Sequence, residues 1–350
     1  MTIASELTKL NTNLTNSYTA VSGKGGTLPS AQNFDNLATA ISSIPSGGGG
    51  YSELPNYQVE NGVASKITKA LTGNEFSDIT SIGTDGLKYA FMYCSGLSGK
   101  LDLSSLTTVG STGMHNAFAY CSAITSVDLS SLINIGNHGC WYAFNYCTGL
   151  KEVDFSLLPS VGSHGLNSAF AESRLTSISF PSLTSVETYG LASAFLNCRS
   201  LTSVDLSSLT TVGSYGLSSA FNDCFNLTSV DLSSLTTVGS YGLSSAFAYC
   251  SAITSVDLSS LTTVGSSGLN SAFKQCTQLQ HVYFNALTSA SFGTYVNQFQ
   301  NMMSSTGNKK VHRLHFPSNL ESTISGLTGY PLFGGTSGYV ILSYDLPATS

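Results

Sequence analysis

Hydrophobic and polar residues alternate in a short unit that recurs along most of the chain. One copy spans residues 201–224 and reads LTSVDLSSLTTVGSYGLSSAFNDC. Within residues 203–207 every second position is apolar, which predicts a strand with one buried face. The later apolar positions are spaced i, i+3, i+4 and i+7, as on one face of a short helix: Leu217, Ala220, Phe221 and Cys224. Each unit thus predicts a strand, a bend at Gly213 and a short helix.

An Ala-Phe dipeptide marks each copy of this unit. Its phenylalanine recurs at eight positions: Phe91, Phe118, Phe144, Phe170, Phe195, Phe221, Phe247 and Phe273. The successive gaps are 27, 26, 26, 25, 26, 26 and 26 residues. Because no unit can bury its apolar stripe alone, neighbouring units must stack. The chain is therefore predicted to form an α/β solenoid from a repeat of about 26 residues.

The motif VDLSSL…VG…GL-x-x-AF-x-x-C-x-x-L resembles the BspA-type leucine-rich repeat, over roughly residues 75–320. The resemblance implies a leucine-rich-repeat solenoid in which each repeat is a strand, a bend and a short helix. Family members of this kind are often bacterial surface or adhesion proteins. Residues 1–10 lack the basic and apolar regions of a secretory signal, so we expect no signal peptide. We also expect no cell-wall sorting signal, which is a second departure from the family that the repeat resembles.

The N-terminal residues 1–45 do not follow the repeat. A heptad-like seam is formed by Ile3, Leu7, Leu10 and Leu14, and a second apolar stripe runs over residues 34–44. Both predicted helices are short and would be marginal alone, so we expect an anchor that oligomerises or inserts into a larger assembly. A Gly-rich linker at 46–52, the solenoid at 53–300 and a C-terminal capping repeat at 301–350 complete the predicted organisation.

Both ends of the chain carry a second resemblance. Residues 10–41 are similar to N-terminal segments of minor structural proteins of phages of Gram-positive bacteria, and residues 314–346 to the closing unit of repeat proteins from the same phages. The resemblance implies a tail or capsid fibre of a virion, anchored to other virion proteins through its N-terminus. Trimers are the usual arrangement in such appendages, so it also implies a homotrimer.

Few residues carry a charge. The charged fraction is 9%, against roughly 25% in ordinary soluble domains. Disorder is excluded by 41% hydrophobic and 10% aromatic residues. The net charge of −6 argues against nucleic acid as a partner, since binding phosphates requires clustered Lys and Arg. No apolar run approaches the roughly 20 residues of a membrane span, so we expect none.

Cysteines form one column of the repeat, three residues after its Phe. The members are Cys94, Cys121, Cys147, Cys198, Cys224, Cys250 and Cys276, while Cys140 takes a Leu position in its own unit. Zinc sites need local pairs such as C-x-x-C, and none is present, so we predict neither a metal site nor a cofactor. Stacked equivalent side chains point in parallel and do not favour disulfides. A buried, structural role is predicted instead.

An aspartate column lies between two inward apolar positions and should face outward from the sheet. It consists of Asp102, Asp128, Asp154, Asp205, Asp231 and Asp257. Two interpretations compete: these carboxylates bind cations or a cationic partner, or they keep the sheet face solvated and unattractive to other strand edges. Solvation is favoured, because isolated carboxylates flanked by Ser supply few ligands for calcium.

A column of rings is the strongest candidate for a binding surface. The residue before the repeat Gly is His138, His164, Tyr189, Tyr215 or Tyr241 in five successive units. Exposed rings with few charges nearby suit stacking on sugars or the hot spots of a protein partner. The alternative is that each ring only packs on its neighbour. A second set, Tyr93, Tyr120, Tyr146 and Tyr249, precedes the cysteines and is expected to flank the core.

No catalytic arrangement is apparent. His115, His281, His312 and His315 are scattered, and no Ser-His-Asp or paired-carboxylate pattern occurs in a cleft-like context. We therefore expect a protein without enzymatic activity. The favoured hypothesis is a virion protein that displays the solenoid for adhesion to a host-surface glycan or protein. The alternatives are a bacterial cell-surface adhesin and an intracellular interaction scaffold.

Overall fold

The computed structural model describes residues 57–60, 63–67, 76–288, 312–322 and 340–346. The chain divides into two compact units, Met1–Ala70 and Leu71–Ser350. In the first unit, β1 (Tyr57–Glu60) and β2 (Val63–Ile67) pair as an antiparallel hairpin. The predicted anchor, with Ile3, Leu7, Leu10 and Leu14, lies outside the described residues. So do the predicted domain boundaries near 45, 52 and 300, which stay predictions.

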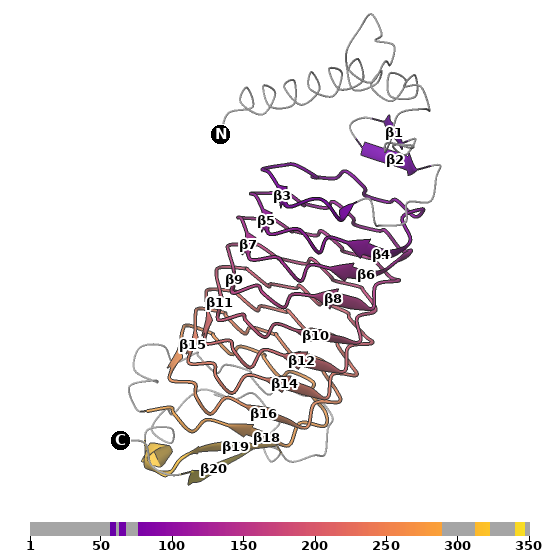
Figure 1. Cartoon of the computed structure of the whole chain (residues 1–350). Coiled ribbons are helices and arrows are strands. Elements are labelled where there is room, and N and C mark those ends of the chain that lie inside the picture. The colour runs from indigo at the N-terminus through magenta and orange to yellow at the C-terminus, as the bar shows by residue number, and fades with distance from the viewer. Residues whose placement is uncertain (1–56, 61–62, 68–75, 289–311, 323–339, 347–350) are drawn as a thin grey trace, which may run out of the picture. The chain divides into compact units, whose positions relative to one another are not determined.

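The second unit is a solenoid of stacked repeats, here called rungs, each containing a long strand, a bend, a short strand and a turn segment (Figure 1). The long strands are β4 (Gly99–Asp102), β6 (Ile124–Asp128), β8 (Glu152–Asp154), β10 (Ser177–Ser179), β12 (Ser203–Asp205), β14 (Ser229–Asp231), β16 (Ser255–Asp257) and β18 (His281–Tyr283). The short strands are β3 (Ser81–Ile82), β5 (Thr108–Val109), β7 (Asn134–Ile135), β9 (Ser160–Val161), β11 (Ser185–Val186), β13 (Thr211–Val212), β15 (Thr237–Val238) and β17 (Thr263–Val264). Rungs are named below after their long strands.

Neighbouring rungs pair in parallel and in register, so equivalent residues face each other. Val204 pairs with Val230 and Asp205 with Asp231. The apolar member of each strand points inward, and the leucines of the repeat are fully buried. The repeat phenylalanines stack face to face through the core, with ring centroids 5.3–5.7 Å apart. The predicted leucine-rich-repeat solenoid is therefore confirmed.

The predicted short helix of each repeat is wrong. Over residues 215–224 some amides donate to the next rung, as from Leu217 to the Gly242 carbonyl (2.8 Å) and from Ser219 to Ser244 (2.9 Å). The amides between them close three-residue turns within the rung, as from Ala220 to the Leu217 carbonyl (3.0 Å). Every fourth residue has a positive φ, including Tyr215 (55°), Ser219 (54°) and Asp223 (62°). This segment is called the turn ladder below.

Rung spacing explains why a helix does not form. Packed helices need about 8–10 Å between their axes, whereas paired strands lie about 4.8 Å apart. The turn ladder bonds to its neighbours like a strand, so it has the same spacing as the sheets. The apolar spacing i, i+3, i+4 and i+7 fits both structures, because the turn ladder also repeats every four residues.

A glycine precedes the turn ladder in most rungs because the backbones of adjacent rungs approach closely there, whereas Glu187 takes this place in the β10 rung. A Cβ atom on Gly239 would lie 2.7 Å from the carbonyl carbon of Gly213 and 2.8 Å from the nitrogen of Ser214. These are backbone atoms that cannot move aside. The Val-Gly pair of the repeat therefore marks a point where the backbones of adjacent rungs lie close together.

The β8 rung interrupts both columns of strands. β8 pairs with β6, and β9 pairs with β11, but β8 does not pair with β10 and β9 does not pair with β7. Pro159 lies just before β9 and has no backbone N–H. At the equivalent positions, the amides of Ile133 and Thr184 each donate a hydrogen bond to a carbonyl of the preceding rung. The connection from Ser173 to Leu175 is also one residue shorter than its equivalents. Pairing of the long strands stops again between β14 and β16.

Two further parallel strands continue the column after β18: β19 (His312–Pro317) and β20 (Val340–Leu346). Leu314 and Phe316 are buried, and a short 3-10 helix (Ser318–Leu320) follows β19. These strands belong to the region predicted as the cap. Within the described part of the chain, no helix has the length and apolar character needed to cross a membrane.

The turn ladder predicts different responses at two adjacent serines. Ser219→Val should lower the free energy of unfolding by about 1–2 kcal/mol more than Ser218→Val, because only Ser219 has a positive φ, which a β-branched residue tolerates poorly. Urea denaturation of both variants measures this. Equal effects at the two positions would instead indicate a helix.

Candidate binding surface

The predicted column of rings forms a continuous stack along the solenoid. Successive centroid distances are 4.4 Å from His138 to His164, 4.8 Å to Tyr189, 4.6 Å to Tyr215 and 4.9 Å to Tyr241. The ring planes are parallel within 6–21°. Each ring belongs to the first positive-φ residue of its turn ladder and is half-buried. The structure thus brings all five predicted residues together.

Three rings that sequence reasoning did not include extend this stack toward the N-terminus. Trp141 lies 5.1 Å from His138, His115 lies 4.9 Å from Trp141, and Tyr89 lies 5.2 Å from His115. Trp141 meets the His138 ring at 53°, and its indole nitrogen is buried without a hydrogen-bond partner. The signal was the spacing of Trp141, three residues after His138. The eight rings are called the ring row: Tyr89, His115, Trp141, His138, His164, Tyr189, Tyr215 and Tyr241.

Mutual stacking determines which atoms of the ring row reach solvent. His164, Tyr189 and Tyr215 each have a ring against both faces. They therefore present ring edges and hydroxyl groups rather than open faces. After Tyr241 the column continues with the small, buried Ser267. A sugar can stack on a ring face only near the ends of the row, whereas hydrogen bonds and edge contacts are available along its length.

The ring row carries little charge at neutral pH. Burial lowers the pKa of His115, as does the positive charge of Lys88. Burial and the neighbouring His138 likewise lower the pKa of His164. The ammonium of Lys88 is paired with Asp85 at 3.2 Å. The surface is thus aromatic, polar at its edges and nearly neutral.

The second tyrosine set does not flank the core as expected. Tyr93 is 56% exposed, and Tyr120, Tyr146 and Tyr249 are also exposed. Tyr93 stacks on Tyr120 at 4.6 Å, and Tyr120 on Tyr146 at 4.9 Å. These residues occupy the third positive-φ position of the turn ladder, which turns their side chains outward. The error follows from the helix prediction, which placed them beside the buried cysteines.

The aspartate column has a structural role that neither sequence interpretation included. The Asp205 carboxylate accepts a hydrogen bond from the amide of Ser207 at 3.0 Å, and Asp231 accepts one from Ser233 at 3.0 Å. The same contact recurs at the other members: Asp102, Asp128, Asp154 and Asp257. Each carboxylate thus stabilises the bend after its strand. One oxygen of each carboxylate is therefore engaged by a backbone amide of its own rung.

The cysteines are buried and free of disulfides. Six of the thiols donate to the Phe carbonyl of the preceding rung, as from Cys224 to Phe195 at 3.2 Å and from Cys250 to Phe221 at 3.1 Å. Burial raises the pKa of Cys147 to about 12 and that of Cys94 to about 11. These thiols therefore remain protonated and bind neighbouring rungs together.

Two of the histidines that seemed scattered meet at the C-terminal strands. Nδ1 of His281 lies 2.8 Å from Nε2 of His315, and Nδ1 of His315 lies 2.9 Å from both carboxylate oxygens of Asp345. His315 is buried, and its hydrogen bond lowers the pKa of Asp345. This chain joins β18, β19 and β20. No group of three or more metal-ligating side chains converges among the described residues.

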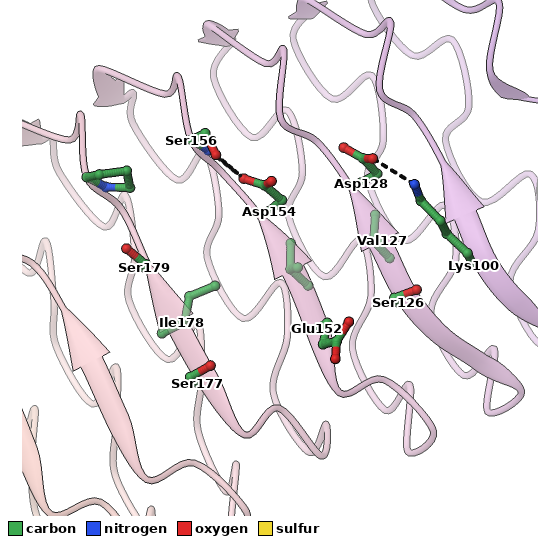
Figure 2. A pocket seen from close by; sticks show the side chains of 12 residues that line it. Lys100, Ser126, Val127, Asp128, Glu152, Asp154, Ser156, Ser177, Ile178 and Ser179 are labelled. Carbon is green, nitrogen blue, oxygen red and sulfur yellow. Dashed lines mark hydrogen bonds and ion pairs between the residues drawn. The ribbon is translucent and has the colours of Figure 1, made fainter.

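A groove lies on the outer face of the long strands, beside the gap between β8 and β10 (Figure 2). Its volume is about 480 Å³. Lys100 at one end donates to Asp128 at 2.8 Å. Figure 2 shows Glu152 between Ser126 and Ser177, with Asp154 farther along the same strand. Sequence reasoning missed this site because it depends on the break in strand pairing.

These features define a class of protein: a parallel solenoid of short rungs with leucine and phenylalanine columns in its core. The chain belongs to the BspA type leucine rich repeat region family, whose model matches residues 71–191 and 166–306 in six copies. No curated protein matches the chain significantly.

Several solved structures are similar to parts of the chain. The pneumococcal vaccine antigen PcpA is 13% identical, with 78% of each chain covered and a TM-score of 0.34. A leucine rich cell surface protein from Faecalibacterium prausnitzii is 17% identical, with 76% of this chain and 83% of that chain covered and a TM-score of 0.27. The leucine rich repeat protein of T. pallidum is 17% identical, with 66% of this chain and 81% of that chain covered and a TM-score of 0.23. At these values the likeness does not extend to function.

The bend contact predicts a pH-dependent contribution of Asp205 to stability. Asp205→Ala should lower the free energy of unfolding by about 0.5–1 kcal/mol at about pH 7, whereas Asp205→Asn keeps an oxygen acceptor and should lose less. Hydrogen bonds from Ser207 lower the pKa of Asp205 in the folded chain. Its contribution is therefore present above the unfolded value of about 3.9 and is lost as pH falls through the folded pKa.

Urea denaturation of the three proteins at about pH 7 and about pH 3 measures this effect. The difference between wild type and Asp205→Ala should shrink at the lower pH. A difference of the same size at both pH values would contradict the role of the carboxylate.

Proposed function

We propose that this chain is a non-catalytic adhesion protein whose solenoid presents the ring row to a surface glycan or protein. The observation that carries the proposal is the ring row itself. A buried packing element would have its rings covered on every side, whereas these rings keep hydroxyl groups and edges accessible in a nearly neutral surface. Amphipathic rings of this kind dominate the hot spots of protein interfaces.

The proposed setting is a phage virion, in a tail or capsid fibre. It is supported by the resemblance of residues 10–41 and 314–346 to phage structural proteins. In this setting the N-terminal seam of Ile3, Leu7, Leu10 and Leu14 joins three copies and attaches them to other virion proteins. The solenoid then projects toward the host. No nucleic acid, cofactor or metal takes part in the proposed function.

Substitution of three tyrosines tests the binding surface. The combined variant Tyr189→Ser, Tyr215→Ser and Tyr241→Ser should reduce attachment to host cells at least about tenfold, since central aromatic hot spots contribute that much or more. Serine already occupies this column at Ser267 with the same backbone conformation, so the fold should persist. Attachment is measured by sedimentation of labelled full-length protein with cells.

The matched control is Tyr249→Ser, which removes an exposed tyrosine that lies outside the ring row. Its attachment should equal that of the wild type. Unchanged attachment of the triple variant, with its rungs still folded, would reject the ring row as the contact surface.

Mass spectrometry of purified virions tests the proposed setting separately. Peptides of this chain should be found in particles that have been freed of host debris, at a stoichiometry that is a multiple of three. Detection only in the host cell envelope would support a bacterial surface adhesin. Detection only in the soluble cell extract would support an intracellular scaffold.

A further inference from the structure

The bends of the β6 and β8 rungs differ from those of the later rungs on their outer surface. Ile133 is 49% exposed and Leu157 is 53% exposed, and Pro159 is exposed beside them. The position of Leu157 is occupied by serine in the later rungs: Ser182, Ser208 and Ser234. Ile133 and Pro159 share a second position of the repeat, which is occupied by threonine in the later rungs: Thr184, Thr210 and Thr236. Among the bends that the structure describes, exposed aliphatic side chains are therefore found at these two neighbouring bends.

The groove beside β8 adjoins this apolar bend. Ser156, which lines the groove, immediately precedes Leu157, and Pro181 lines the groove from the next rung. Lys100 is engaged by Asp128, and Asp154 accepts hydrogen bonds from the amide and hydroxyl of Ser156. The Glu152 side chain is exposed and makes no hydrogen bond or ion pair with the described residues. An available carboxylate thus lies in the groove (Figure 2), next to the apolar bend.

We propose that the groove and the bend together dock a segment of a partner protein, in which a Lys or Arg side chain is flanked by apolar side chains. The basic group pairs with Glu152, with the hydroxyls of Ser126 and Ser177 on either side. The apolar neighbours cover Ile133, Leu157 and Pro159. Arginine fits best, because its planar group donates to a carboxylate and to a hydroxyl at the same time.

Charge complementarity favours this occupant. The charged side chains that line the groove are three carboxylates and one lysine, and the lysine is already paired. Lys151 and Arg174 are exposed nearby in the sequence but do not line the groove. A calcium ion needs six to eight oxygens, which one available carboxylate does not supply. A sugar would find no aromatic ring among the lining residues.

A second copy of this chain is a poorer occupant. Its Lys88 and Lys100 are held in ion pairs, and Arg199 and Lys274 lie over the rings of Phe225 and Tyr249. Three further basic side chains are exposed, but the leucine beside each of them is buried: Leu150 beside Lys151, Leu175 beside Arg174 and Leu314 beside Arg313. Because none of these three presents a basic group next to an accessible leucine, a different protein is the partner that the surface fits.

Panning of the full-length chain against a random-peptide display library tests the proposal. Enriched peptides should carry Lys or Arg next to apolar residues. Their affinity, measured by calorimetry with synthetic peptides, should fall at least about tenfold for Glu152→Gln and for Leu157→Ser. Leu157→Ser introduces the residue of the neighbouring rungs, so folding should be retained.

Two control variants remove the same chemistry elsewhere: Glu187→Gln and Phe225→Ser, which are both exposed. Their peptide affinity should be unchanged. Enrichment of no peptide, enrichment of peptides without a basic residue, or equal affinity for Glu152→Gln would overturn the proposal. The proposal would also be overturned if the chain bound Ca²⁺, or an oligosaccharide on a glycan array, and if that binding required Glu152. Attachment through the ring row should be unchanged in both groove variants, which separates this proposal from the proposed function.

Discussion

The spacing between rungs is the constraint on which the rest of the structure depends. Except at the breaks in strand pairing after β7, β8 and β14, long strands, short strands and turn ladders bond to the next rung through their backbones. All three must therefore repeat at the strand spacing of about 4.8 Å. A helix cannot meet this condition in every rung. The chain instead adopts a positive φ at every fourth residue of each turn segment, with the hydrogen bonds to neighbouring rungs stabilising that conformation. The turn ladder then sets the directions of its side chains, including the ring row.

The same spacing accounts for the low fraction of charged residues and for the many serines and threonines. In-register stacking places identical residues opposite each other, so a charge repeated in every rung would repel itself. Hydroxyl groups avoid this cost because they bond along the column, as from Thr210 to the Thr184 carbonyl at 3.0 Å and from Thr236 to Thr210 at 3.0 Å. Asp205 and its equivalents are tolerated because each also bonds to the bend of its own rung. Rings gain from stacking and so form continuous rows.

The sequence allowed the strands, the phenylalanine column and the stacked repeat to be predicted, because alternation and repetition determine which side chains are inward. The turn ladder could not be predicted, since the spacing of Leu217, Ala220, Phe221 and Cys224 fits a helix equally well. That one error misplaced Tyr93, Tyr120 and Tyr146 and hid the contribution of Trp141 to the ring row. The groove beside Glu152 depends on strand pairing between rungs, which a reading of one repeat does not contain.

The central functional claim is that the ring row is the surface that meets the partner. Trp141 is the single tryptophan of the chain and lies within that row, in contact with His115, His138 and His164. The most direct measurement is therefore a titration of tryptophan fluorescence in the full-length chain with wall fragments of the cells to which the chain attaches in the sedimentation assay. The account predicts a saturable change in emission that parallels binding measured by sedimentation. Binding by sedimentation without any change in emission would contradict it.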